Sequence, residues 1–169
     1  MTLLFAEWSS WRDNIKKKKK KSWQEKLHDD KGHPTVSPIT GKMSKKWGTG
    51  TMVIPAPMEV DEIMRRVRKG KLITINEIRE QLQQKHQVDV ACPITTGIFA
   101  WIAADEAEKE GRKRITPYWR TLKTGGELNG NYPGGIEALS ARLEAEGFEI
   151  IQKGKKYFVE NYEQYLMKS

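Results

Sequence analysis

Aromatic and cationic side chains are concentrated in residues 114–138, RITPYWRTLKTGGELNGNYPGGIEA. Tyr118 and Trp119 are adjacent there, and Arg120 follows them. Aromatic rings stack on nucleobases, and a guanidinium donates to phosphate or carboxylate groups. The sequence leaves two roles open for the aromatics, which either face a flat ligand or fill the core. Arg120 likewise donates either to a phosphate or to a core carboxylate.

Glycines in the same stretch predict a long, shaped connection. Pairs at 125–126 and 134–135, together with Gly130, permit the positive φ angles of turns. A plain connection between two elements is usually two to six residues long. Gly134 and Gly135 also precede a predicted helix, whose first amide groups are suited to a phosphate. Turn geometry and phosphate contact both remain open for these two glycines.

Two helices are predicted upstream of this stretch. Apolar residues recur at helical spacing in the first, which is expected to end at Gly70: Val60, Ile63, Met64 and Val67. In the second, Thr74 is a predicted N-cap and Glu77, three residues later, completes a capping box. Cationic residues lie off the apolar stripe of the first helix, where they face solvent or a partner.

Two more helices and a hairpin complete the predicted fold. The third helix spans about 94–110 and is expected to turn Ile94, Ile98, Trp101 and Ile102 inward. The fourth begins near Ile136 and ends at Gly147. Residues 148–160, FEIIQKGKKYFVE, read as a β-hairpin around Lys-Gly-Lys. The pattern predicts a mainly α fold with a small β-hairpin, of the winged helix-turn-helix kind.

Positive charge is concentrated in the N-terminal part of the chain. Residues 1–50 contain 12 Lys/Arg and 5 Asp/Glu, whereas residues 51–169 contain 18 and 17. We therefore predict a basic, flexible arm over residues 1–50 and a nearly neutral domain over residues 51–169. Six consecutive lysines at 16–21 are either a solvated stretch or an arm that binds phosphates. The tryptophans of this region leave room for a short helix, at about 5–15 or 22–29, that docks on the domain.

Composition argues against several classes of site. Cys92 is the single cysteine and the three histidines are scattered, which excludes an intramolecular disulfide and argues against a metal site. No cofactor is predicted. No apolar run reaches the roughly 18 residues that span a membrane. The start, MTLLFAEW, is unlike a signal peptide. We expect a cytoplasmic protein without membrane contact.

Five segments in order resemble the DNA-binding domain of the alkylguanine-DNA alkyltransferases: GKLITINEIREQL, TTGIFAWIAA, TPYWRTL, GNYPGG and ARLEAEGFEI. The resemblance covers roughly residues 57–150. In that family an Ile-Pro-Cys-His-Arg run supplies the cysteine that accepts the alkyl group, a histidine activates it and a glutamate orients the histidine. Pro117 and Arg120 set the register of this run, and it places Tyr118 at the cysteine and Trp119 at the histidine.

The resemblance therefore implies a protein that is not an enzyme. A phenol with a pKa near 10 is a poor alkyl acceptor, and an indole cannot act as a base. Only Glu146 of the family's catalytic group remains. The tyrosine and arginine with which the family rotates a base and fills its place are matched by Ile75 and Ile94, and its loop serine by Pro133. Alkyltransferase-like proteins, which lack the acceptor cysteine and bind alkylated guanine without repairing it, are the nearest in kind.

We thus expect a DNA-binding protein that recognises alkylated or damaged bases without repairing them. The ligand or base pocket expected from the resemblance consists of Tyr118, Trp119, Tyr132 and Glu146. The expected nucleic-acid contacts are Arg65, Arg66, Arg68, Lys69, Lys71, Arg120, Lys123, Gly134 and Gly135. The alternative is a general nucleic-acid module, RNA included, whose pocket is merely filled. RNA or a repair protein are further candidate partners.

Overall fold

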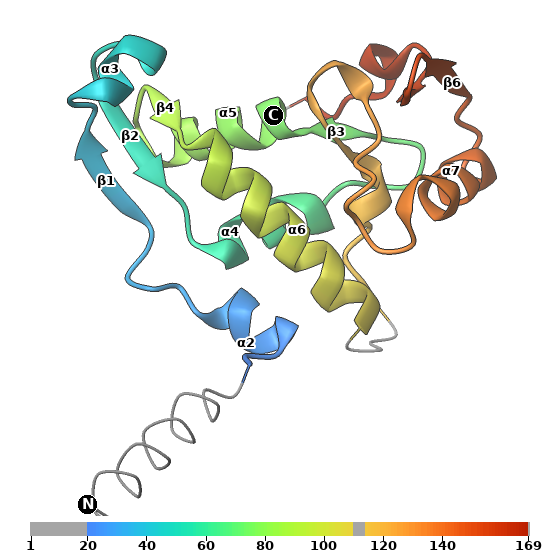
Figure 1. Cartoon of the computed structure of the whole chain (residues 1–169), viewed down its shortest axis with the longest axis horizontal. Coiled ribbons are helices and arrows are strands. Elements are labelled where there is room, and N and C mark those ends of the chain that lie inside the picture. Colours follow the sequence, from blue (N-terminus) through green and yellow to red (C-terminus); the bar gives the residue numbers. More distant parts are fainter. Residues whose placement is uncertain (1–19, 110–113, 169) are drawn as a thin grey trace, which may run out of the picture.

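Helix α6 (Pro93–Lys109) is the element around which the other helices are arranged, and Figure 1 shows it crossing the molecule. The computed structural model describes residues 20–109 and 114–168. Helices α4 (Pro57–Arg65), α2 (Trp23–His28) and α5 (Ile75–His86) all contact α6. The core between them joins α6 to the C-terminal half of the chain, so the helices form one packed unit.

The buried face of α6 is made of small residues. Thr96 and the alanines at 100, 103, 104 and 107 are all at most 3% exposed. The predicted orientation of this helix was wrong for Ile94, Ile98 and Trp101, which are 58%, 45% and 39% exposed. Alanine lets a neighbouring backbone approach closely, so this face packs against α4 and α2 while the large side chains on another face stay outside.

The apolar stripe of α4 is confirmed, since Val60, Ile63 and Met64 are at most 5% exposed. The helix is shorter than predicted: it ends at Arg65, and Gly70 lies in a later turn with φ +80°. The capping box of α5 is also confirmed. Glu77 accepts a hydrogen bond from the Thr74 amide at 2.8 Å, and the Thr74 side chain pairs with Glu77 in return.

Glu59, in the first turn of α4, makes the stability of this region sensitive to acid. Burial alone raises the pKa of Glu59, but Lys85, the Ala56 amide and His86 outweigh it and hold the pKa below the ordinary 4.5. A carboxylate whose folded pKa is depressed stabilises the fold above its unfolded pKa and loses that contribution as the pH falls further.

We expect Glu59→Gln to lower stability at pH 7 and to flatten the loss of stability that the parent shows below about pH 4.5. Chemical denaturation between pH 3 and pH 7 measures both effects. Glu62→Gln, on an exposed position of the same helix, is the matched control and should keep the parent's profile. An acid profile identical for Glu59→Gln and the parent would contradict the assignment.

The strands of the described residues form three small sheets, and two of these sheets join segments that are distant in sequence. Strands β1 (Thr35–Pro38), β2 (Thr51–Ile54) and β4 (Val90–Ala91) form the first, antiparallel between β1 and β2 and parallel between β2 and β4. The second pairs β3 (Ile73–Thr74) in parallel with β5 (Thr121–Leu122). The third is the predicted hairpin, β6 (Ile150–Lys153) and β7 (Lys156–Val159). The first two sheets were not predicted.

Residues 20–50 lie against the rest of the chain. Helix α2 docks on α6 and buries Leu27, as in the predicted alternative of a helix near 22–29. Helix α3 (Lys42–Trp47) lies between β1 and β2 along the chain. The pairing of β1 with β2 crosses residue 50, where we placed the domain boundary; that boundary and the flexibility of the arm stay predictions. The other candidate helix, at 5–15, and most of the lysine run lie outside the described residues.

The C-terminal half positions the aromatic stretch. Short 3₁₀ turns, η1 (Tyr118–Arg120) and η2 (Thr124–Gly126), flank β5, and helix α7 (Gly135–Ala145) follows. Gly147 has φ +92° just after α7, as predicted for the residue that ends the helix. A last 3₁₀ turn, η3 (Tyr162–Tyr165), follows the hairpin. The predicted mainly α fold with small β elements is confirmed.

Two absences apply to the described residues alone. Within 20–109 and 114–168, no helix has the length and apolar character needed to cross a membrane. The same residues contain no cluster of His, Cys, Asp and Glu side chains that could hold a metal ion.

Candidate functional site

Tyr118 lies inside the protein. It is 1% exposed, and its ring meets Trp119 and Tyr132 edge to face, with centroid distances of 5.4 Å and 6.0 Å. Tyr132 is 3% exposed. Edge-to-face packing of this kind is the preferred arrangement of neighbouring aromatic rings. Of the two roles that the sequence left open, Tyr118 and Tyr132 therefore fill the core.

The environment of Tyr118 keeps its phenol protonated. Burial raises the pKa of Tyr118 to about 12, and the positive charge of Arg142 only partly opposes that rise. The hydroxyl donates to Glu108 Oε1 at 3.3 Å. A buried, neutral phenol with a carboxylate as its partner offers neither access nor a nucleophilic oxygen to an alkyl donor.

Arg120, the last residue of η1, connects this 3₁₀ turn to the end of α7. Its Nε lies 3.0 Å from both carboxylate oxygens of Glu146, its Nη2 also pairs with Glu146, and its Nη1 donates to the Val67 carbonyl at 2.8 Å. The Trp119 indole donates to the same carboxylate at 3.2 Å. The guanidinium therefore serves a core carboxylate rather than a phosphate. Glu146 accepts hydrogen bonds and is not free to contact a ligand.

Arg142, on α7, covers the aromatic group formed by Tyr118, Trp119 and Tyr132. Its guanidinium carbon is 4.4 Å from the Trp119 ring centroid and 5.7 Å from that of Tyr118. Its Nη2 pairs with Glu108 at 3.1 Å. The four residues predicted as a ligand pocket thus lie together, as the resemblance implied, but packing occupies the space between them. Trp119 also borders a hollow, beside Arg65 and Arg114.

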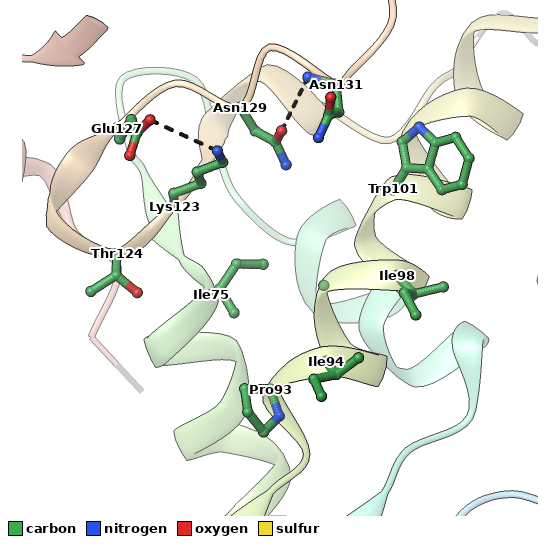
Figure 2. A pocket seen from close by; sticks show the side chains of 11 residues that line it. Ile75, Pro93, Ile94, Ile98, Trp101, Lys123, Thr124, Glu127, Asn129 and Asn131 are labelled. Carbon is green, nitrogen blue, oxygen red and sulfur yellow. Dashed lines mark hydrogen bonds and ion pairs between the residues drawn. The ribbon is translucent and has the colours of Figure 1, made fainter. Parts of the chain in front are cut away.

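A larger open groove lies between α6, the start of α5 and the loop after β5 (Figure 2). Its volume is about 820 Å³. Ile94, Ile98 and Trp101 of α6 form one wall, and the residues of the opposite side are Ile75, Lys123, Thr124, Glu127, Asn129 and Asn131. The walls therefore combine apolar side chains with one cation, one carboxylate, one hydroxyl and two amides, and a largely apolar lining with a few polar groups is typical of ligand sites.

The loop side of this groove is held in place by its own contacts. Asn129 Oδ1 accepts a hydrogen bond from the Asn131 amide at 3.1 Å, and Lys123 Nζ lies 3.8 Å from Glu127 Oε1 (Figure 2). The side chain of Asn131 is exposed. Of the predicted nucleic-acid contacts, Lys123 is the one that lines the groove.

The other predicted cations lie elsewhere. Arg65 pairs with the buried Asp61, whose other oxygen accepts from Thr116. Arg66, Arg68 and Lys71 line a separate hollow together with the C-terminal residues. Lys69 is exposed in the turn between α4 and β3. None of these cations lines the groove along α6.

The two glycines at the start of α7 are accounted for by backbone geometry. Gly134 and Gly135 have φ of +80° and +67°, in the region that favours glycine. A Cβ on Gly134 would also lie 2.4 Å from the Ala138 Cβ. Turn geometry therefore explains both residues, and a phosphate contact there stays a prediction.

Sequence reasoning missed the groove because it assigned Ile94, Ile98 and Trp101 to the core. The signal that could have found it is a second, small-residue stripe on the same helix, Ala100, Ala103, Ala104 and Ala107. A helix with two apolar faces buries the one that fits its neighbours most closely. The large side chains on the other face then stay exposed, and they make this face a candidate for an interaction.

No protein-family model matches the chain, and no curated protein matches its sequence. Chains of solved structures do match, among them two complexes with DNA. One is S. pombe Atl1 in complex with damaged DNA containing O6-carboxymethylguanine, with a TM-score of 0.49 and 19% identity over 67% of this chain and 94% of that chain. The other is S. pombe ATL in complex with DNA, with a TM-score of 0.50, 20% identity and the same two coverages. The chain has the fold of S. pombe ATL. The resemblance stated from the sequence is thereby confirmed at the level of the fold.

Proposed function

We propose that this protein binds duplex DNA through the exposed face of α6 and the groove beside it, and that it recognises alkylated bases without removing the alkyl group. The observation that carries the proposal is the fold shared with S. pombe ATL, which was solved in complex with DNA. The residue-level resemblance to alkyltransferases within 57–150 supports the same activity.

The apolar side chains and amides of the groove are suited to contact a base that has left the stack of a damaged duplex. Ile94 and Ile98 are large, exposed apolar side chains, and DNA-bending proteins insert such residues between base steps. The amides of Asn129 and Asn131 can donate to and accept from base edges. A damaged base is the easier one to extrude, because its pairing and stacking are weaker.

Alkyl transfer is absent from the proposal because the residue at the acceptor position cannot perform it. Tyr118 is buried, its pKa is raised to about 12, and its neighbour Trp119 has no basic nitrogen. Cys92, the single thiol, is 6% exposed and packs with Ile39 and Met52, in a cluster separate from the aromatic group.

The test is a paired titration of the full chain with two duplexes, identical except for one O6-alkylguanine. We expect tighter binding to the alkylated duplex, and mass spectrometry should find the lesion intact and the protein unmodified after incubation. Equal affinity for both duplexes would refute lesion recognition but not DNA binding. A protein that gains the mass of the alkyl group would refute the non-enzymatic assignment.

Replacing Ile98 by Asp should weaken binding to both duplexes by at least about tenfold, because it places a negative charge among phosphates. Met43→Asp is the matched control, since Met43 is a comparably exposed apolar residue on α3, away from the groove. Fluorescence anisotropy at fixed salt measures both variants. Equal losses in the two would show that the α6 face does not bind the duplex.

One observation favours the alternative, a general nucleic-acid module with a filled pocket. Tyr118 and Tyr132 do fill the predicted base pocket. This alternative predicts equal affinity for the alkylated duplex, the plain duplex and a duplex RNA of the same sequence. The same titration, extended to RNA, separates it from the main proposal.

A further inference from the structure

Helix α2 packs against α6, and its residues precede the segment 57–150 in which the chain resembles alkyltransferases. Its Trp23 meets Trp101 edge to face, with a centroid distance of 5.1 Å, and its Leu27 is 1% exposed. A capping box at Ser22 and Glu25 starts the helix. The contact fixes residues 22–28 beside the C-terminal half of α6, as Figure 1 shows.

Lysines surround this contact. Lys26 and Lys109 both stand over the Trp23 ring, at 3.8 Å and 4.7 Å from its centroid. Lys21 pairs with Asp29, and Lys20 and Lys31 are exposed. In both Lys26 and Lys109 the ammonium nitrogen itself lies over the ring, a cation–π contact that holds positive charge at the junction of α2 and α6, and the ammonium of Lys109 also pairs with Asp105 at 3.1 Å. The sequence adds four more lysines, 16–19, directly before Lys20.

Trp101 connects this basic surface to the groove. It lines the groove on one side and, on the other, a hollow of about 430 Å³ whose further walls include Lys21, Trp23, Lys26 and Lys31. A duplex lying along Ile94, Ile98 and Trp101 would therefore continue toward α2. There it would meet four lysines, at 20, 21, 26 and 31, among residues that also contain three acids, one of which is paired with Lys21.

We propose that α2 and its lysines form a second DNA-contact element, which binds the phosphate backbone of the duplex next to the part held by α6. The proposal rests on the proposed function and adds to it a contact surface specific to this chain. The lysines supply affinity without sequence preference, because each phosphate that they neutralise releases a condensed counterion. Trp23 and Leu27 dock α2 on α6 and thereby hold these lysines next to the duplex.

The first experiment measures how affinity for an undamaged duplex depends on salt. Replacing Lys20, Lys21 and Lys31 together by Gln should reduce the slope of log affinity against log salt by about 0.9 for each phosphate that is no longer neutralised. Replacing Lys42, Lys45 and Lys46 of α3 by Gln removes the same charge from the same N-terminal region, at a site distant from α2 (Figure 1). This control should keep the parent's slope.

The second experiment keeps every charged residue and removes the contact that holds α2 against α6. Trp23→Ala deletes the ring that holds α2 on Trp101, and we expect DNA affinity to fall roughly threefold or more at low salt. Circular dichroism checks that the remaining fold is intact. Parent-like affinity for Trp23→Ala would show that docking of α2 is irrelevant and would overturn the proposal.

The outcomes separate this proposal from the proposed function. A parent that binds DNA, with an unchanged slope for the α2 triple variant, overturns the α2 contact alone. Equal reductions of the slope in the α2 and α3 triple variants also overturn it, because net charge would then be the cause. A parent that binds no DNA overturns both proposals, and a reduced slope seen with duplex RNA but not with DNA overturns the choice of ligand.

Discussion

Replacing Tyr118 by Ala is expected to lower the free energy of unfolding by about 3–5 kcal/mol, the usual cost of truncating a large buried aromatic side chain. Tyr118 is 1% exposed and packs edge to face on both Trp119 and Tyr132. Its removal leaves a cavity among elements that are fixed by other contacts, so the surrounding structure can collapse only partly.

Urea denaturation at pH 7 measures this destabilisation. Tyr118→Phe is the matched control, because it keeps the ring and removes only the hydroxyl. The hydroxyl donates to Glu108 at 3.3 Å, and its removal should cost about 1 kcal/mol or less. A Tyr118→Ala protein with nearly parent stability and a selective loss of lesion preference would contradict the core assignment and restore Tyr118 as a ligand contact.

The same reasoning changes which substitutions test lesion recognition. An open pocket formed by Tyr118 and Trp119, as the resemblance implies, would make Tyr118→Ala and Trp119→Ala the variants expected to lose a preference for alkylated DNA. In the structure these rings are packed against each other and under Arg142, so their removal disturbs the fold first. If the proposed function holds, the variants to test first are those of side chains that line the open groove, among them Ile94 and Asn131.

Local patterns in the sequence predicted the elements whose signals are short-range. The 3.6-residue stripe of α4, the capping box of α5 and the Lys-Gly-Lys turn of the hairpin each depend on residues within one turn of one another. Each was confirmed. The order of motifs also identified the fold, because the resemblance used five segments at once.

Long-range packing could not be predicted in the same way. Strand β4 is two residues long and pairs with β2, some 38 residues earlier, a contact that no local pattern shows. On α6, both the alanine stripe and the isoleucine stripe are apolar, and the choice between them depends on which face fits α4 and α2. The candidate groove follows from that choice.

The candidate site was predicted only in part, because motif order carries information about which residues are neighbours but not about how their side chains pack. The resemblance grouped Tyr118, Trp119, Tyr132 and Glu146 from three separate segments, and these residues are neighbours in the structure. Their role as a ligand pocket stays a prediction. The resemblance could not show that the larger rings would occupy the space, which depends on their volumes and on Arg142 above them.

Glu146→Gln tests how far this filled site holds the fold together. Arg120 and Glu146 are 13% and 9% exposed at their side chains, and the carboxylate accepts from both Arg120 and the Trp119 indole. Removing one partner of a largely buried ion pair leaves the other charge uncompensated, which costs about 3–5 kcal/mol. Gln keeps the volume of Glu, so that the destabilisation reports the charge rather than a cavity.

Glu108→Gln is the matched control for this prediction. Its ion pair with Arg142 is 39% and 37% exposed at the side chains, and exposed pairs contribute about 1 kcal/mol or less. Urea denaturation of both variants at pH 7 should therefore give decreases in stability that differ severalfold. Equal, small decreases would mean that Arg120 finds another partner in the variant, and Arg120 would then again be a candidate for a phosphate. The comparison thus decides whether Glu146, which the resemblance matches to a catalytic carboxylate of the alkyltransferases, has a structural role in this chain.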